Sequence, residues 1–359
     1  MSRLLDFVAL SLTPFSWRRG IGGRLRSGEP PDSLIAALAP GTSEARATLA
    51  RLPGAARAVL ERADRTGIGL VVWGDADFPP ALSAIDDPPP VLWFRGDRDA
   101  LRLPAVALVG SRAGSPCAVA VAEQLAAELA AHQVVIVSGL ARGVDSAAHR
   151  GALQSGGPTM AVLGSGVDVV YPPEHRRLAA TIARTPACAV VSELAPGTRP
   201  LRWFFPLRNR IISGLSQAVV VVEAGEKSGS LITARTALDQ GREVLAVPGA
   251  VLGGRNRGGH ALIRDGAKIV ECADDILEEL RLPERFTPAR PGAPVRAAGD
   301  RHDPVLAVLA PGEPRDLDAI AAESGLPADR LLPRLFELEL QGHLRRAGGG
   351  RFIRVDRSC

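Results

Sequence analysis

The sequence predicts an α/β protein whose central domain is built on a doubly wound, mostly parallel β-sheet. Short runs rich in Val and Ile alternate with helical stretches over about 170 residues, which is the pattern that βαβ units produce. Several of these runs end in turns rich in glycine and serine. Helical patterns before and after the sheet predict a smaller domain on each side.

Seven candidate strands follow one another through the middle of the chain. They are residues 105–110, 134–139, 159–164, 188–193, 218–223, 243–249 and 267–271. Each is too short for a helix and is bounded by Gly, Pro or polar residues, as buried strands are. The preceding segment, 75–97, is rich in proline and aromatic residues, and we expect it to pack on the edge of the sheet.

The rest of the chain divides into three further regions. Residues 1–66 are expected to form a helical domain of short helices with a tight turn at 20–23, ahead of the sheet domain at 67–280. Residues 281–302 are rich in Pro, Ala and Arg without periodicity, which is typical of a linker. Residues 303–359 contain three helical patterns and a hairpin pattern, which predict a C-terminal winged-helix domain.

Composition and charge narrow the class of protein. The net charge of the 359 residues is +4, but residues 67–285 hold 22 basic and 23 acidic side chains, so an anion site must come from their placement. No apolar run approaches the roughly 18 residues of a membrane span, and no signal peptide is recognisable, so we expect a cytoplasmic protein without a membrane partner. The four cysteines are widely spaced, and we interpret them as free thiols.

Three turns at the predicted carboxyl ends of strands have the composition of an anion site. Ligands of open α/β sheets bind at these ends, where helix N-termini present free N–H groups. The turn residues are Gly110, Ser111 and Arg112; Ser138, Gly139, Arg142 and Gly143; and Lys227, Ser228, Gly229 and Ser230. Any one of them could be an ordinary βα turn. None fits the glycine patterns of dinucleotide or ATP sites, so these cofactors are disfavoured.

Two of the turns carry signals for the start of the next helix. Ser115 and Pro116 form a typical cap and first-turn pair, and Asp145 is a candidate cap for the helix after Gly143. Further on, residues 201–210 set Trp203, Phe204 and Phe205 beside three arginines. Such a mixture is typical of single-stranded nucleic-acid sites, although we expect at least one of the rings to pack in the core.

Catalytic signals are weak in this sequence. Asp145 and His149 lie one helical turn apart and could form a carboxylate-oriented base, but a cap and a packed histidine explain them equally well. No nucleophile has the companion base that activation requires, and no cluster has metal-ligand spacing. We therefore predict a site that holds its ligand, with no catalytic residue, metal or cofactor.

Six motifs together resemble the DNA-processing protein A family, also called DprA or Smf. They are GSR at 110–112, SGLARGVDSAAH at 138–149, GSGVDVVYP at 164–172, FPLRNRIISGL at 205–215, EAGEKSGSLITA at 223–234 and VPG at 247–249. The resemblance covers roughly residues 75–280 and implies an extended Rossmann fold that binds single-stranded DNA in a basic pocket and forms a homodimer. It also implies a role in natural transformation, protecting incoming single strands and helping to load RecA. The flanks are similar to the family's sterile-alpha-motif-like or helix-hairpin-helix-like N-terminal region and to its winged-helix domain.

The resemblance also assigns phosphate-binding positions. They are Gly110, Ser111, Arg112, Ser138, Gly139, Gly143, Arg208, Asn209, Arg210, Lys227, Ser228, Gly229 and Ser230. Many members have a lysine after the pair that corresponds to Tyr171 and Pro172, where this chain has Pro173. We assign that contact to Arg176 or Arg177, although arginine differs from lysine in geometry.

Two other functions remain open. The first is a nucleotide phosphoribohydrolase-like enzyme, which needs a carboxylate on the helix after the glycine turn; here none occurs before Asp239. The second is a transcription regulator acting through the winged helix. Its third helix sets Arg330 and Arg334 against Glu337 and Glu339, which is typical of a protein-contact or accessory module and not of a duplex reader.

Overall fold

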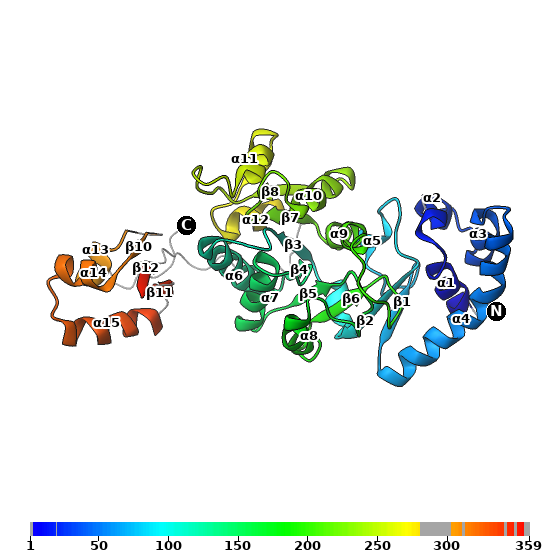
Figure 1. Cartoon of the computed structure of the whole chain (residues 1–359), viewed down its shortest axis with the longest axis horizontal. Coiled ribbons are helices and arrows are strands. Elements are labelled where there is room, and N and C mark those ends of the chain that lie inside the picture. The colour runs from blue at the N-terminus through cyan, green and yellow to red at the C-terminus, as the bar shows by residue number, and fades with distance from the viewer. Residues whose placement is uncertain are drawn as a thin grey trace. The chain divides into compact units, whose positions relative to one another are not determined.

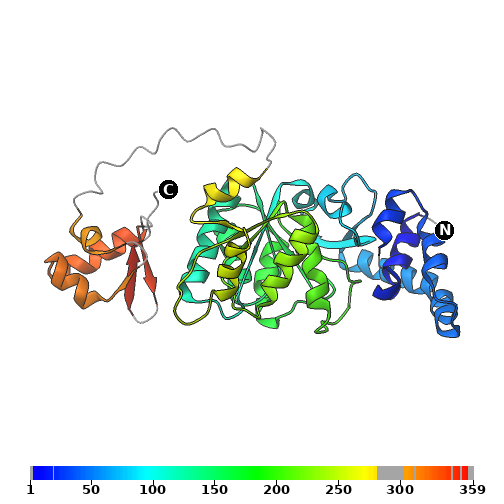
Figure 2. The same ribbon diagram turned by 90° about the horizontal axis from the view of Figure 1, so that it is seen from above.

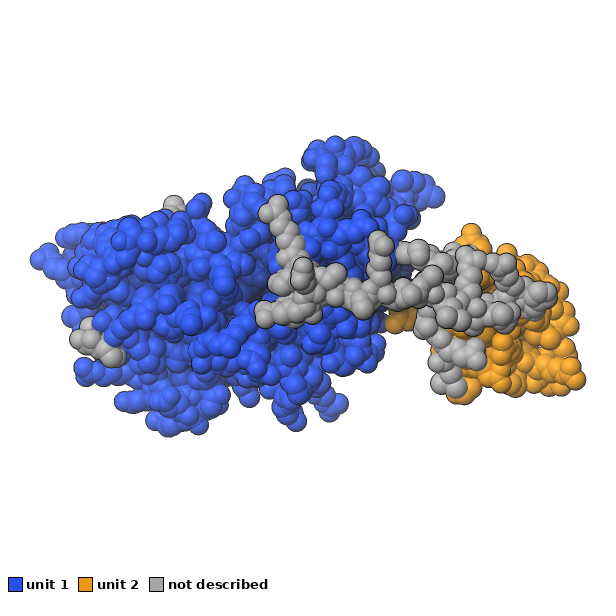
Figure 3. All heavy atoms as spheres, turned by 180° about the vertical axis from the view of Figure 1, so that it is seen from behind, with its two compact units in different colours: residues 1–287 blue, residues 288–359 orange. Residues whose placement is uncertain are grey.

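The computed structural model describes residues 3–18, 20–280, 303–310, 313–340, 343–347 and 350–354. Two compact units are present, residues 1–287 and residues 288–359, shown in different colours in Figure 3. The predicted linker, 281–302, lies outside the described residues. The division of the chain into four regions stays a prediction.

A nine-stranded sheet forms the centre of the first unit (Figure 1). Its strands are β1 (Gly69–Val72), β2 (Val91–Gly96), β3 (Ala105–Val109), β4 (Val135–Ser138), β5 (Thr159–Val162), β6 (Ala189–Ser192), β7 (Ala218–Val221), β8 (Glu243–Ala246) and β9 (Lys268–Ile269). The spatial order is β1-β2-β6-β5-β4-β3-β7-β8-β9, and strands β3 to β9 pair in parallel. All seven predicted strands are therefore present, and the doubly wound sheet is confirmed.

The first two strands were not predicted as strands. β2 pairs antiparallel with β6 and β1 pairs antiparallel with β2, so together they extend one edge of the sheet. The expectation that 75–97 packs on the edge is confirmed, because the end of this segment is β2. Trp93 in β2 is fully buried. The prolines before β2 concealed the strand, although they lie outside its hydrogen-bonded register.

Helices cover both faces of the sheet (Figure 2). They are α5 (Pro80–Ser83), α6 (Pro116–Ala131), α7 (Val144–Gln154), α8 (Arg176–Ile182), α9 (Phe204–Leu215), α10 (Gly229–Asp239), α11 (Arg257–Arg264) and α12 (Ala273–Glu279), with 3-10 turns at Arg98–Arg102 and Pro173–His175. Alternate side chains of β3 separate two cores, since Val106 and Leu108 pack with α6 and α7, whereas Ala107 and Val109 pack with α9 and α10. Burial on both faces explains why the strands are continuous apolar runs.

Four helices and a 3-10 turn precede the sheet: α1 (Arg3–Ser11), the turn Phe15–Arg18, α2 (Ile21–Arg26), α3 (Pro31–Leu38) and α4 (Ser43–Thr66). The predicted tight turn at 20–23 is wrong. Gly20 has a φ of 69° just before α2, but Gly22 and Gly23 lie inside the helix. A Cβ at Gly22 would stand 2.4 Å from the carbonyl oxygen of Asp86, so this glycine permits close packing against the sheet domain.

The second unit has the three helices and the hairpin that the sequence predicts. They are α13 (Pro304–Val308), α14 (Leu317–Ser324) and α15 (Ala328–Leu340), then β11 (Leu344–Ala347) and β12 (Arg351–Arg354), with β10 (Pro314–Arg315) pairing to β12. Its own core includes Leu306, Ile320, Leu335 and Phe352. No helix in the described parts of either unit is long and apolar enough to cross a membrane.

Candidate functional site

A cavity opens at the carboxyl ends of β3 and β7. Its volume is about 610 Å³. These two strands are neighbours in the sheet, and the chain leaves β3 for α6 on one face and β7 for α10 on the other. Open α/β sheets bind ligands where the helices that follow two neighbouring strands lie on opposite faces of the sheet. The N-termini of these helices diverge there and leave a crevice between them.

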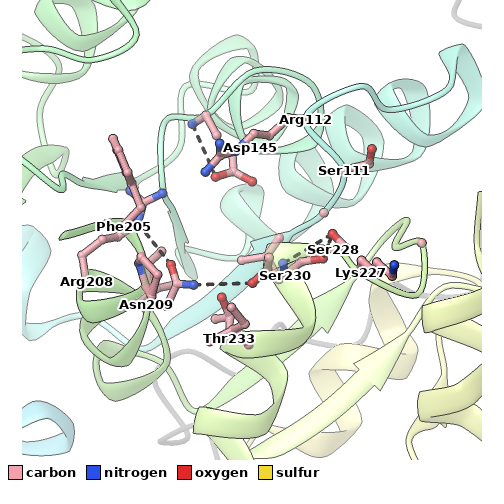
Figure 4. Close-up of a pocket in the computed structure, with 18 of the residues that line it drawn as sticks. Ser111, Arg112, Asp145, Phe205, Arg208, Asn209, Lys227, Ser228, Ser230 and Thr233 are labelled. Carbon is pink, nitrogen blue, oxygen red and sulfur yellow. Dashed lines mark hydrogen bonds between the residues drawn. The ribbon is translucent and has the colours of Figure 1, made fainter. Parts of the chain in front are cut away.

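Residues of the first and third predicted turns and of α9 line this cavity, and Ala141 and Asp145 reach it from the loop between β4 and α7 and from the first turn of α7 (Figure 4). Nine of the predicted site residues line it: Gly110, Ser111, Arg112, Arg208, Asn209, Lys227, Ser228, Gly229 and Ser230. Gly139 and Arg142 line a small adjoining cavity of about 60 Å³, together with Arg112 and Arg208. The structure thus brings the first and third turns to one site and places the second turn beside them.

The first turn is held in place by Glu223, which lies just after β7 and ahead of the third turn. The Ser111 N–H donates to the Glu223 carbonyl at 2.8 Å, and the Ser115 N–H donates to the Glu223 carboxylate at 3.2 Å. Ser115 also accepts from the Ala118 N–H at 3.1 Å, so its predicted role as the cap of α6 is confirmed. Arg112 is exposed and, within the described part of the chain, its guanidinium forms no ion pair.

The second turn is organised by a buried carboxylate. Asp145 accepts from the N–H groups of Gly139 at 3.1 Å and Ala141 at 3.4 Å, which fixes the loop between β4 and α7. Its predicted role as the cap of α7 is wrong, because Gly143 occupies that position and Asp145 bonds backward into the loop. Burial raises the pKa of the Asp145 carboxyl, against the opposing effect of Arg208 and the backbone donors.

Arg208 lies beneath the cavity floor and is buried, with 6% of its surface exposed. It donates to the Gly139 carbonyl at 2.6 Å and to the Val162 carbonyl. Burial lowers its pKa to about 10, an effect that Asp145 partly opposes, so the guanidinium stays charged at neutral pH. Much of its hydrogen-bonding capacity is thus used inside the protein, and it supplies a fixed positive charge under the site.

The third turn begins α10 with several backbone donors. Ser228 is the cap, accepting from the Ser230 N–H at 3.4 Å, and its hydroxyl lies 2.7 Å from that of Ser230. The Asn209 amide donates to the Gly229 carbonyl at 3.5 Å, which joins α9 to this turn. Lys227 is exposed, and no carboxylate of the described chain pairs with it. A helix start with a free cation beside it favours an anion.

Other predicted residues lie away from the main cavity. Ser138 is fully buried and donates to the Leu108 carbonyl at 2.6 Å, so its hydroxyl cannot contact a ligand. Arg210 points from the opposite side of α9 and pairs with Glu193. Arg176 and Arg177 begin α8, are exposed and line neither cavity at the site, so the missing lysine has no evident substitute there.

The aromatic segment is divided between two environments. Phe205 faces the site, with its ring centre 5.4 Å from that of Tyr171 and 5.7 Å from the Arg112 guanidinium carbon. Trp203 and Phe204 instead pack against Phe15, which confirms the expectation of a packing role for part of this segment. Sequence reasoning missed Tyr171 as a site residue, because nothing in the spacing relates it to Phe205.

The suspected acid–base pair is not formed. His149 is fully buried, and its Nδ1 lies 2.7 Å from the Thr159 hydroxyl, while Asp145 bonds to backbone N–H groups. Burial lowers the pKa of His149 to about 3, so the ring is neutral. This geometry favours the interpretation of His149 as a packed core residue.

Comparisons with known proteins show the family of this chain. Residues 69–281 match the sequence model of DNA recombination-mediator protein A, and residues 288–350 match that of the DprA winged helix domain. Protein Smf of Escherichia coli is 41% identical over 291 residues, covering 79% of this chain and 77% of Smf. DNA processing protein DprA of Streptococcus pneumoniae is 47% identical over 205 residues, covering 57% and 72%.

Solved structures of the same family also resemble this chain. The crystal structure of DprA from Streptococcus pneumoniae superposes with a TM-score of 0.68 at 36% identity, covering 79% of this chain and 99% of that one. A DNA processing protein A from Helicobacter pylori, whose structure was described for its single-stranded DNA binding mode, gives 0.53 at 28% identity, covering 59% and 94%. The match to the family model covers more than half of the chain, and the chain belongs to the DNA recombination-mediator protein A family, DprA.

Proposed function

We propose that this protein binds single-stranded DNA without sequence preference, through the phosphates that it holds in the cavity between β3 and β7. One observation carries the proposal. Arg112 and Lys227 are exposed cations, unpaired within the described structure, that line a cavity shared with the N-terminus of α10. Point charges and backbone N–H groups recognise phosphates and do not read bases. The DNA-binding relative from Helicobacter pylori supports the choice of ligand.

The contacts fall into three kinds. Arg112 and Lys227 supply positive charges on exposed side chains. Ser228 to Ser230 supply the backbone N–H groups at the N-terminus of α10, and Gly110 and Ser111 let the backbone come close to the ligand. Arg208 and Asp145 do not contact the ligand in this proposal; their hydrogen bonds fix the loop after β4 that borders the cavity. Arg142 is exposed but pairs with Glu174 at 2.5 Å, so it contributes only when that pair opens.

Binding should be tested by fluorescence anisotropy with single-stranded and duplex oligonucleotides over a salt series. We expect a preference for single strands, and an affinity that falls steeply with salt because phosphate contacts release counterions. Arg112→Ala and Lys227→Ala should lower affinity alike for all sequences, and each should reduce the salt slope by about 0.7. Arg57→Ala, which removes an exposed arginine on α4, is the matched control. Unchanged binding by a folded Arg112→Ala, Lys227→Ala double variant would rule out this cavity.

The wider role follows from the family. We propose a cytoplasmic homodimer that protects incoming single strands in natural transformation, helps to load RecA and does not hydrolyse nucleotides. Light scattering would test the dimer, and RecA filament formation on protein-coated single strands would test loading. A RecA assembly rate unaffected by the protein would contradict the mediator role.

An enzyme of the phosphoribohydrolase kind is less well supported by the site. Asp145 is the one carboxylate that lines the main cavity, and it is buried and bonded to Gly139 and Ala141. On α10 the first carboxylate is Asp239, at the far end of the helix from the cavity. Nucleotide hydrolysis assays on the purified protein would detect the activity if it exists.

A further inference from the structure

A second cavity lies on the other side of α9, where the N-terminal helical region meets the sheet domain. Its volume is about 350 Å³. It is bounded by the 3-10 turn Phe15–Arg18, by Asp87 and Pro88 before β2, and by the first turns of α9. α9 lies between the central strands and the N-terminal helices (Figure 1).

Two buried arginines line this cavity with unused hydrogen-bond donors. Arg18 is 6% exposed and Arg210 is 9% exposed. Within the described chain, Arg18 Nε and Arg210 Nη1 are buried without a hydrogen-bond partner. Glu193 lies 2.5 Å from Arg210 and 4.0 Å from Arg18, so one carboxylate serves two guanidinium groups. Buried donors without acceptors are costly, so a ligand whose acceptor atoms reach them would stabilise the site.

The charges of the cavity balance, so the ligand need not be an anion. Glu193 and Asp87 offset Arg18 and Arg210, and Asp87 lies 3.3 Å from Arg210 Nε. A phosphate would be repelled by the partly exposed Asp87. A neutral group with acceptors on its edge meets no such penalty.

Aromatic rings form the rim. Trp203 is half exposed, at 51%, and its ring lies 5.5 Å from that of Phe15, edge to face. Phe204 packs against the Trp203 ring at 4.0 Å, and half of Trp203 stays exposed. An exposed part of an aromatic ring and arginine side chains in one cavity suit a nucleobase, which stacks on aromatic rings and carries acceptors on its edges. Every base has both features, so such a site does not require a particular sequence.

The second cavity and the main cavity both adjoin a third cavity at the start of α9. Pro206 lines both the main cavity and a third cavity of about 430 Å³. That third cavity shares the lining residues Asp87, Leu207 and Arg210 with the second cavity. A strand whose phosphates sit at Arg112 would reach Trp203 by passing over Pro206, with its phosphates turned away from Asp86, Asp87 and Asp239 of the third cavity.

We propose that the cavity lined by Trp203, Phe15, Arg18 and Arg210 is a base-binding subsite for the same single strand. The base stacks on the Trp203 ring, and its edge accepts from the free N–H groups of the two arginines. This inference rests on the proposed binding of single-stranded DNA at the main cavity. It gives residues 15–18 of the helical N-terminal region a part in DNA binding.

The test compares two oligonucleotides of equal length, one of thymidines and one of abasic residues. Trp203→Ala should lower affinity for the thymidine strand at least about fivefold and leave affinity for the abasic strand nearly unchanged. Trp203→Phe should restore most of the binding, because it keeps an aromatic face. Leu238→Ala, which removes an exposed apolar side chain on α10 that lines none of these cavities, should change neither affinity.

Failure of this proposal differs from failure of the proposed function. Arg112→Ala should weaken both strands, and if it weakens neither, the main cavity is not the phosphate site. If Arg112→Ala acts as expected but Trp203→Ala weakens both strands equally, or neither, the base subsite is wrong.

A measurement on the unaltered protein avoids any effect of mutation on folding. Strands carrying 4-thiothymidine at successive positions should crosslink at one position to Phe15 or Trp203, as assigned by fragmentation of the crosslinked peptides. Crosslinks that fragmentation assigns to Tyr171 or Phe205 alone would overturn the proposal.

Discussion

Arg112 and Arg208 show how the environment separates two residues of one type. Sequence reasoning gave both the same role, as phosphate ligands. Arg112 is exposed at the mouth of the cavity, whereas Arg208 is buried and donates to two carbonyl groups, one in the loop after β4 and one at the end of β5. The first can move to a ligand, and the second maintains the shape into which the ligand fits.

Arg208→Lys should destabilise the fold while keeping the charge. An ammonium group cannot reach the Gly139 and Val162 carbonyls with the planar geometry of a guanidinium, so at least one buried carbonyl loses its donor. We expect a loss of about 1.5–3 kcal/mol in the free energy of unfolding, measured by urea denaturation. Arg112→Lys, at the exposed position, should change stability by less than about 0.5 kcal/mol. Equal stability of the two variants would contradict this assignment.

Gly143→Ala should disrupt the site for two reasons. Gly143 has a φ of 73°, and a Cβ there would stand 2.3 Å from the Ser111 carbonyl oxygen. Gly156 has nearly the same φ, 71°, but a Cβ there meets nothing within 4 Å, so Gly156→Ala measures the backbone strain alone. We expect about 1–3 kcal/mol of destabilisation from Gly156→Ala, and from Gly143→Ala a larger loss together with weaker DNA binding. Calorimetry and anisotropy on the same samples would show whether the two substitutions differ.

At the scale of elements, the site depends on how neighbouring segments are held to the sheet. The long helix α4 is attached by Arg62, whose guanidinium lies 2.6 Å from Asp168 in the loop after β5. The same carboxylate accepts from the Gly197 N–H at 2.7 Å. Burial alone would raise the pKa of Asp168, but the hydrogen bonds from Arg62, Gly197 and its own backbone N–H, together with the charge of Arg62, lower the net pKa. The link between α4 and the sheet domain is therefore sensitive to acid.

The Arg62–Asp168 contact should contribute stability that is lost in acid. Because the folded state lowers the pKa of Asp168, the contribution is present above the unfolded value of about 3.9 and disappears as the pH falls through the lower folded value. Arg62→Ala should reduce Tm slightly at pH 7, by an amount equivalent to no more than about 1 kcal/mol, and this reduction should shrink as the pH falls below about 3.9. Arg65→Ala, an exposed arginine on the same helix, is the control. A Tm difference between Arg62→Ala and the parent that does not shrink with acid would contradict the prediction.

Charged side chains of α15 take part in ion pairs with one another and with neighbouring segments. Arg334 pairs with Asp303 at 2.6 Å and with Glu337 at 2.7 Å, and Arg346 pairs with Glu339 at 3.0 Å. These contacts pair both arginines with carboxylates, which leaves less free positive charge for a duplex. The role of this unit as an accessory or protein-contact module stays a prediction.

For the whole molecule, the two units have separate cores, and the proposed DNA site lies entirely in the first. A chain that ends at residue 287 should therefore fold and bind single strands with an affinity within about twofold of the full protein. Circular dichroism and anisotropy at matched salt would check this expectation. A loss of tenfold or more in a folded truncated chain would show that the winged helix takes part in strand binding.

The seven parallel strands, the helices of the flanking regions and the glycine turns with their cations could be read from the sequence. Their signals are local, because a buried strand is a short apolar run and a βα turn requires glycine or a capping serine within a few residues. The resemblance of six motifs to one family added the ligand class. The same local reasoning missed β1 and β2, which belong to the sheet through antiparallel pairing at its edge.

Tertiary structure alone decided which side of each element faces the ligand. Helix α9 directs Phe205 and Arg208 to the main cavity and Arg210 to the second one, although these residues lie within six positions of one another. Arg208, Asp145 and Ser138 are buried and hydrogen-bond to backbone groups of other segments, so they stabilise the site and do not contact the ligand. A sequence pattern cannot show these partners. Long-range packing, which depends on segments far apart in the chain, was the information that the sequence alone could not supply.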